Sequence, residues 1–302
     1  MLALFTLLLE VVLPVFAVVA VGAWVGRRFD LQVGPINRLA IYAAVPALVF
    51  RTMSGIEMAW GPALHLVGGY LAFLLLMGAI AFAVGRGWRP SRRRTLVGTS
   101  IFGNAANLNL PVALFAFGDP GLDRALVLYV VTALALFSLG PLLLGRAIGV
   151  RRAVRTALGF PVLWATVAGL ALNATGSTLP LGATRAIGLL ADAAVPVVLL
   201  SLGIHLARSA HWRPERRTWL AVGLKLGLGP VVAAAVGAAL GLAGLDLAVL
   251  VVLGAMPTAI NAAMLAVEFG GEAEQVGEAV VVGTALAVLT LPLVLAFARL
   301  LL

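Results

Sequence analysis

The chain has 302 residues, of which 62% are hydrophobic and 11% are charged, and its mean hydropathy is +1.10. A water-soluble core of this length cannot cover so much apolar surface, so the composition excludes a soluble globular protein and favours a polytopic membrane protein. The formal net charge is +9. The absence of cysteine and the wide scatter of three histidines exclude disulfides and thiolate metal sites and leave no metal-ligand spacing.

Long apolar runs follow one another along the chain and predict an all-α protein with ten transmembrane helices. These expected spans cover residues 5–26, 34–53, 62–84, 94–118, 123–145, 156–175, 182–207, 217–240, 247–269 and 276–300. The first run lacks a basic start and an Ala-x-Ala cleavage site, so it is interpreted as a retained span rather than a signal peptide. No stretch between the runs is long enough for a soluble domain.

The fourth and ninth runs are interrupted by residues that disfavour a helix, in FGNAANLNLP at 102–111 and GAMPTAIN at 254–261. A bilayer offers no water to unpaired backbone groups, so such breaks are tolerated only where protein or a wet cavity covers them. Each break lies about ten residues past the start of its run, which is near the middle of the hydrocarbon layer. Paired broken helices are typical of secondary transporters and indicate the substrate site.

Arginines gather at every second connection between the expected spans, in the ranges 27–38, 86–94, 146–155 and 208–217. The positive-inside rule makes this side cytoplasmic, which predicts a multi-pass protein of the plasma (inner) membrane with both termini on the extracytoplasmic side. Topology thus explains the net charge without a nucleic acid partner. The arginines are also too dispersed to form a polybasic lipid-binding tail.

The chain resembles itself at an offset of about 150 residues. The string AAVP occurs at 43–46 and at 193–196, and the string TAL occurs at 132–134 and at 284–286. These matches, together with the two breaks, predict a five-helix repeat over residues 1–150 and a second over residues 151–302. Because five is an odd number, the two repeats must cross the membrane in opposite directions, with the fourth and ninth spans as a crossing pair.

The runs GNAANLNLPVALFAFG and MPTAINAAMLAVEFG resemble the paired helix breaks of the auxin efflux carrier family, which includes PIN-like proteins and malate permeases. The resemblance extends over essentially the whole chain, although Ala106 and Asn109 stand where glycines are common in the family. It implies a fold like that of the bile-acid and sodium/proton carriers, transport of small organic anions, and a homodimer. It also implies that the substrate-site residues include Asn104, Pro111, Pro257 and Asn261.

The chemistry of a broken helix agrees with that implication. The second half-helix presents unpaired N–H groups and the positive end of its dipole, whereas the first presents free carbonyls. Asparagine and threonine side chains can hold a carboxylate or cap these freed groups. Two prolines in spans that flank the crossing in the family are further lining candidates. The full candidate substrate-binding set is Asn104, Asn107, Asn109, Pro111, Pro257, Thr258, Asn261, Pro46 and Pro196.

Ionisable residues inside a bilayer are costly and are therefore candidates for function. Asp192 lies well inside the seventh expected span and is the best candidate for a coupling proton or sodium ion, unless its carboxylate caps a backbone group or meets headgroups. Lys225 lies about two turns into the eighth span, where it can attract an anion or extend to the cytoplasmic surface; the second interpretation is favoured. No cofactor is expected beyond this coupling ion.

The sequence therefore predicts a secondary transporter that moves malate-like dicarboxylates, monocarboxylates or auxin-like acids by alternating access. The alternatives are a sodium-coupled symporter of the bile-acid carrier type and, more remotely, an intramembrane enzyme. Ser201 and His205 are four residues apart and would share a helix face. No Gly-x-Ser-x-Gly frame, aspartate pair or zinc motif accompanies them, so no catalysis is expected. A channel is disfavoured because an internal inverted repeat fits alternating access.

Overall fold

The computed structural model describes residues 6–56, 58–145, 155, 158–208 and 214–302. Within them the elements are η1 (Leu8–Val12), α2 (Leu13–Arg28), α3 (Val33–Leu39), η2 (Ala40–Ala44), α4 (Val45–Gly55), α5 (Trp60–Val84), α6 (Pro90–Ile101), η3 (Ala105–Asn109), α7 (Leu110–Leu143), α9 (Pro161–Thr175), α10 (Leu181–Arg208), α11 (Arg216–Gly223), η4 (Leu224–Leu228), α12 (Gly229–Ala239), α13 (Gly244–Gly254), α14 (Ile260–Glu268) and α15 (Ala273–Arg299). The expected repeat boundary at 150/151, most of the arginine cluster at 146–155 and the middle of the cluster at 208–217 lie outside the described residues.

The protein is an all-helical, multi-span membrane protein. In the described part of the chain, seven helices are long and apolar enough to cross a bilayer: Leu8–Arg28, Val33–Gly55, Trp60–Val84, Ala105–Leu143, Leu181–Arg208, Arg216–Ala239 and Ala273–Arg299. This is fewer than the ten expected spans. The fourth run is divided between α6, η3 and the start of α7, whose remainder holds the fifth run; the ninth is divided into α13 and α14, and α9 has 15 residues.

Four π-helical turns, η1 to η4, occur in the described residues, and each ends two residues before a proline. Proline has no N–H and its ring clashes with the carbonyl of the preceding turn, so the helix accommodates it by widening locally. The four prolines are Pro14, Pro46, Pro111 and Pro230. The sequence thus places local irregularities inside four apolar helices, three of which carry candidate site residues.

Gly118 separates α7 into two helical parts. Its backbone has φ 68° and ψ −163°, a conformation that is essentially restricted to glycine, and Pro120 follows at the start of the next part. This residue therefore ends the helix that follows the first break and turns the chain into the next apolar helix.

Replacing Gly118 by alanine is expected to destabilise the protein by about 1–3 kcal/mol, because the added Cβ makes this backbone conformation costly. The measurement is the thermal unfolding midpoint of the purified protein in detergent. The matched control is Gly68→Ala within α5, where a Cβ meets nothing within 4 Å. That change should leave stability equal or higher. An equal response of the two variants would contradict the structural role given to Gly118.

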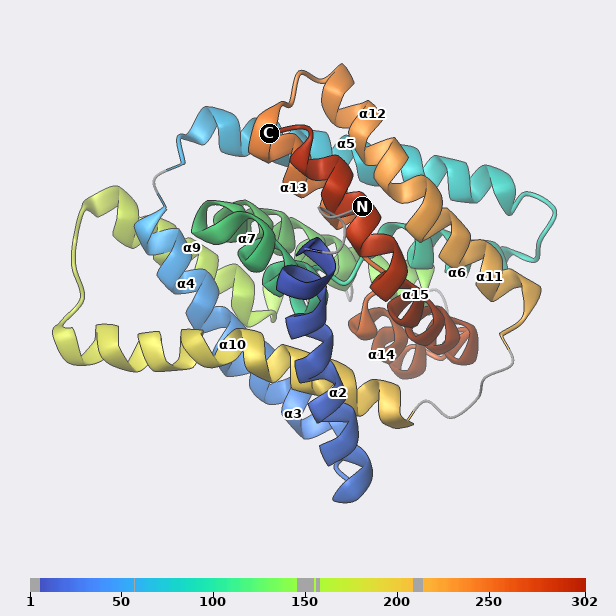
Figure 1. Ribbon diagram of the computed structural model, residues 1–302, viewed down its shortest axis with the longest axis horizontal. Coiled ribbons are helices and arrows are strands. Elements are labelled where there is room, and N and C mark those ends of the chain that lie inside the picture. Colours follow the sequence, from blue (N-terminus) through green and yellow to red (C-terminus); the bar gives the residue numbers. More distant parts are fainter. Residues whose placement is uncertain (1–5, 57, 146–154, 156–157, 209–213) are drawn as a thin grey trace.

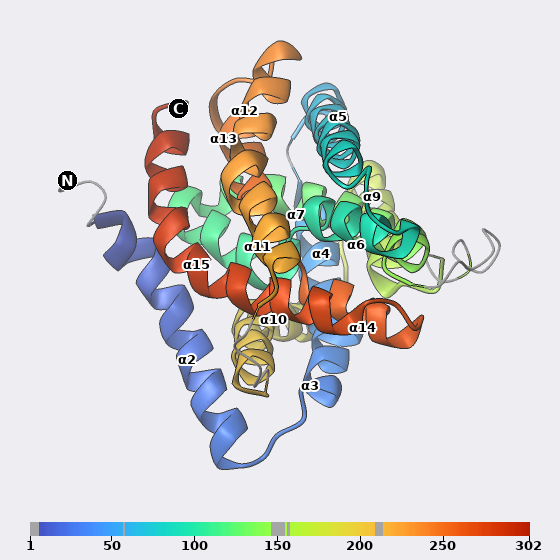
Figure 2. The ribbon, with the colours of Figure 1, turned by 90° about the vertical axis from the view of Figure 1, so that its right-hand side faces the viewer.

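The helices pack as two groups, and each group combines helices from both ends of the chain. The scaffold group consists of α2, α3, α4, α9 and α10. The break group consists of α5, α6, α7 and α11 to α15, and it contains both interrupted segments. In Figures 1 and 2, α2, α3 and α10 occupy the lower part of the molecule, whereas α5, α12 and α13 occupy the upper part.

Close approach of backbones holds the scaffold group together. A Cβ on Gly22 of α2 would collide with the backbone of Leu200, and one on Gly203 of α10 would collide with the Val19 carbonyl. Small residues at such crossings allow the dense packing that substitutes for the hydrophobic effect inside a bilayer. The two groups contact each other mainly where η3 packs on α10 and where α7 packs on α9, α4 and η1.

Candidate functional site: the meeting of two broken helices

The two breaks predicted from the sequence lie side by side and pair their backbones. The Asn104 N–H donates to the Pro257 carbonyl at 2.7 Å, and the Ala259 N–H donates to the Phe102 carbonyl at 3.0 Å. Together they form an antiparallel bridge between Gly103 and Thr258. Each break thereby satisfies backbone groups that the other has freed, which is what unwound chain in a membrane requires.

The side chains of two candidate residues stabilise the breaks. Asn104 precedes η3, and its Oδ1 accepts from the Asn107 N–H at 3.1 Å, as an N-terminal cap does. The Thr258 hydroxyl donates to the Thr99 carbonyl at 3.0 Å, which is near the end of α6. Part of the predicted site is therefore structural, because these atoms hold the unwound backbone in place.

Two other candidates reach across to the scaffold group. The Asn107 Nδ2 donates to the Val198 carbonyl of α10 at 3.1 Å, and the Asn261 Oδ1 accepts from the Asn37 Nδ2 at 3.2 Å. Asn37 is only 2% exposed and lies on α3; its Nδ2 also donates to the Met264 sulfur at 3.1 Å. Asn37 was not predicted as a site residue. Its sequence context offers one indication of such a role, which is an amide side chain near the start of an apolar run.

Within the described chain, three amide atoms at the breaks are buried without a hydrogen-bond partner. They are the Nδ2 of Asn104 and both polar side-chain atoms of Asn109, whose residue is 0% exposed. A buried amide with no hydrogen bond costs about 1–3 kcal/mol, so a native structure that keeps one calls for an explanation such as a ligand, an ion or water. These atoms are therefore candidates for contact with a bound group.

A cavity of about 20 Å³ lies between the breaks, and its walls include Asn104, Asn107, Asn261, Tyr129 and Thr132. Such a volume holds about one water molecule and is far too small for an organic acid. The rest of the candidate set does not line it: Asn109, Pro111, Pro257, Thr258, Pro46 and Pro196. All of its lining residues belong to the break group, and a larger solute needs more room than this conformation provides.

Lys225 is part of this region, and the expectation that it extends to the membrane surface is wrong. The residue is 1% exposed and its Nζ lies 3.4 Å from the Gly254 carbonyl, at the carboxyl end of α13. The ammonium also lies 5.4 Å from the Phe73 ring centre and packs against Gly103 of the first break. Among the described residues it forms no ion pair with a carboxylate. The π-helical turn η4 carries it on the inward face.

Asp192 lies elsewhere, on α10 of the scaffold group. Its side chain is 70% exposed and forms an ion pair with the Arg51 guanidinium of α4 at 2.6 Å. Pro196, one turn later on the same helix, removes a backbone N–H beside this pair. The structure therefore separates the two coupling candidates, with Lys225 at the breaks and Asp192 away from them.

The Ser201 hydroxyl on α10 is 0% exposed and forms no hydrogen bond with any described residue. A nucleophilic serine needs a base within hydrogen-bond reach, so the Ser201 and His205 arrangement considered from the sequence does not form a catalytic pair.

Unwound backbones that pair inside a bundle of apolar helices are typical of membrane transporters. A family model described as "Membrane transport protein" matches residues 7–147 and 146–295. The chain therefore belongs to that family, the auxin efflux carrier family of membrane transporters, and it is not an enzyme.

The chain is similar along nearly its whole length to three proteins whose names describe them as transporters. It is 32% identical over 298 residues to an "Uncharacterized transporter" of Methanothermobacter thermautotrophicus, covering 94% of this chain and 96% of that protein. It is 27% identical over 296 residues to a Rhizobium meliloti protein named "Putative malonate transporter", covering 92% of each chain. A Methanocaldococcus jannaschii transporter is 25% identical over 303 residues, covering 94% of this chain and 97% of that protein.

Proposed function

We propose that the protein is a secondary transporter of small organic anions, with malonate-like dicarboxylates as the first candidates. The observation that carries the proposal is the antiparallel pairing of the two breaks beside unpartnered amides of Asn104 and Asn109. The name of the Rhizobium meliloti relative supports the choice of a short dicarboxylate. Malate-like acids, monocarboxylates and auxin-like acids belong to the same proposal.

The proposal includes the architecture expected from the sequence. Ten spans form two inverted five-helix repeats, residues 1–150 and 151–302, with the arginine-rich connections in the cytoplasm and both termini outside. Each break then belongs to the corresponding helix of its repeat. A homodimer would form through helices outside the break group.

Charge assigns different roles to the two ends of each break. The amino ends of η3 and α14 present N–H groups and positive dipoles, which suit the carboxylates of a substrate. The carboxyl end of α13 suits a cation, and the Lys225 ammonium lies there. We infer that Lys225 takes the place of a diffusible sodium ion and supplies a fixed positive charge near the bound anion.

In an elevator-like or rocking exchange, movement of the break group against the scaffold group would expose the region of the breaks to each side of the membrane in turn. Three polar contacts between the groups would have to break, those from Asn37 to Asn261 and Met264 and the one from Asn107 to Val198. A hydrogen bond is worth about 0.5–1.5 kcal/mol net, so these contacts favour the observed arrangement without preventing movement.

The test is uptake of a labelled panel of organic acids into proteoliposomes under imposed proton, sodium or voltage gradients. We expect saturable uptake of a short dicarboxylate, reduced at least tenfold in the Asn104→Ala/Asn261→Ala double variant. Asn173→Ala is the control, because Asn173 is an exposed amide on α9 that bonds to the Ser54 and Ile56 carbonyls. Unchanged uptake in a folded double variant would remove the basis of the proposal.

Asp192 is proposed to couple transport to protons through its ion pair with Arg51, because protonation of the carboxylate would release the arginine. Asp192→Asn is expected to leave uptake active while removing its response to a pH gradient. The measurement is the ratio of uptake with and without that gradient. If the ratio is unchanged, Asp192 has no coupling role; stimulation of the native protein by sodium would instead favour the bile-acid type of symporter.

A further inference from the structure

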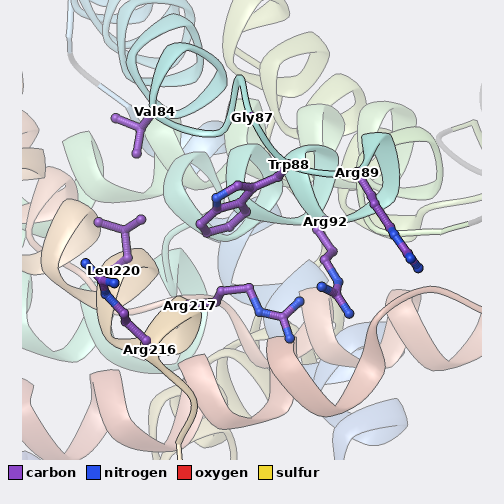
Figure 3. Close-up of a pocket in the computed structure, with 8 residues that line it drawn as sticks. All are labelled: Val84, Gly87, Trp88, Arg89, Arg92, Arg216, Arg217 and Leu220. Atoms are coloured by element: carbon purple, nitrogen blue, oxygen red, sulfur yellow. The ribbon is translucent and has the colours of Figure 1, made fainter.

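A second cavity, of about 540 Å³, opens at the surface and shares no lining residue with the cavity at the breaks (Figure 3). It lies between the connection from α5 to α6 and the start of α11, where two candidate spans end. Its walls include Trp88, Arg89, Arg92, Arg216, Arg217 and Leu220. The arginines that looked dispersed in the sequence are thus brought together from two connections.

The cavity gathers four arginine side chains, and of these only Arg217 forms an ion pair within the described chain, with Glu215. Arg92 and Arg217 are half-buried, and their guanidinium groups point toward one another in Figure 3. No acidic residue of the described chain lines the cavity, although Arg217 also lines a neighbouring pocket with Glu272, Glu274 and Glu278. Both arginines also lie in the first turn of a helix, α6 or α11, where the helix dipole is positive. The cavity therefore keeps an excess of positive charge, which favours an anion.

The other walls indicate which kind of anion fits. Val84 and Leu220 are apolar, and Trp88 has the amphipathic side chain that is enriched at the membrane surface. Guanidinium groups bind phosphate oxygens in pairs, which an ammonium cannot do. Arginine side chains beside apolar side chains suit a phosphate group attached to a lipid better than a free dicarboxylate.

We propose that the arginine cavity binds a phosphate group, contributed by the headgroup of an anionic phospholipid. The site is distinct from the proposed transport site, because the two cavities share no lining residue. Occupation would tie α5, α6 and α11, which all belong to the break group, to the surface of the membrane.

The test measures lipid binding by native mass spectrometry and thermal stability in nanodiscs of neutral phosphatidylcholine, with or without phosphatidylglycerol or cardiolipin. The variant is Arg92→Gln/Arg217→Gln. The control is Arg27→Gln/Arg28→Gln, which removes the same charge from exposed arginines at the carboxyl end of α2. In a further set of measurements, inorganic phosphate is added to the proteins in neutral nanodiscs.

We expect retained anionic lipid and a higher unfolding midpoint in the native protein and in the control, and loss of both in the cavity variant. Stabilisation by inorganic phosphate that the cavity variant alone loses would support the phosphate site and assign its source to solution. Equal lipid and phosphate responses in all three proteins would overturn the proposal. Arg89→Gln/Arg216→Gln repeats the comparison with exposed cavity arginines if the first variant fails to fold.

Discussion

Replacing Lys225 by methionine is expected to reduce uptake at least tenfold and, at the same time, to raise the thermal stability of the protein. The ammonium is buried among the breaks with one weak contact to the Gly254 carbonyl and no carboxylate partner in the described chain. Burial of an uncompensated charge is costly, and exchange of buried charges for apolar side chains of similar volume can stabilise a protein by about 1–4 kcal/mol.

The loss of transport has a separate cause. If Lys225 supplies the positive charge that balances a bound anion, its removal forfeits a charge-assisted interaction of about 1.5–3 kcal/mol, which corresponds to about a 10- to 150-fold loss of affinity. The measurements are initial uptake rates in proteoliposomes and the unfolding midpoint in detergent. Gain of stability with loss of function is the combination expected of a functional site.

Leu226→Met is the matched control for that experiment, because Leu226 is the buried neighbour of Lys225 and carries no charge. It should change neither uptake nor stability appreciably. A fall in both stability and uptake of Lys225→Met would instead make the lysine a structural residue, and normal uptake would exclude it from the transport mechanism.

A covalent link between the scaffold group and the break group is expected to stop transport reversibly. Asn37 on α3 and Met264 on α14 lie in contact across the boundary between the groups. The native chain has no cysteine, so Asn37→Cys/Met264→Cys introduces the only two thiols. A short reagent with two methanethiosulfonate groups joins the thiols through disulfide bonds, so it should reduce uptake to background and a reductant should restore it, because the proposed exchange requires the two groups to move.

The single-cysteine variants, treated with the same reagent, separate the effect of the link from the effect of modifying either residue. Asn37→Cys alone is expected to retain part of the uptake while losing the contact to Asn261. Full transport by a demonstrably cross-linked protein would exclude relative movement at this boundary and would leave only changes within the break group.

Sequence alone was sufficient for the class of protein and for the location of the breaks. Apolar runs with no water-soluble alternative require a membrane, and asparagine and proline in the middle of such runs require unwound backbone. Asn104, Pro257 and Thr258 were selected for that reason, and the structure brings them together. The family resemblance based on the same residues is confirmed by the match over both halves of the chain.

Sequence could not decide which side of an apolar helix faces protein. A helix that is hydrophobic all round has no amphipathic pattern to orient it, so the inward face of Lys225 and the outward face of Asp192 depended on neighbours distant in the chain. The π-helical turns make the facing side still harder to derive from sequence, because each one rotates all later residues of the helix about its axis. Asn37 and the arginine cavity were missed for the same reason.

The sequence by itself thus determined that this protein lies in a membrane, belongs to a family of transporters and unwinds two of its helices at matching places. Composition and residue type suffice for these conclusions because they depend on local costs, those of apolar surface in water and of freed backbone groups in lipid. Only the tertiary structure decided that the breaks pair beside a small cavity and a buried ammonium, and that arginines from two connections share one cavity. Those features arise from contacts between helices far apart in the chain, which no local pattern specifies.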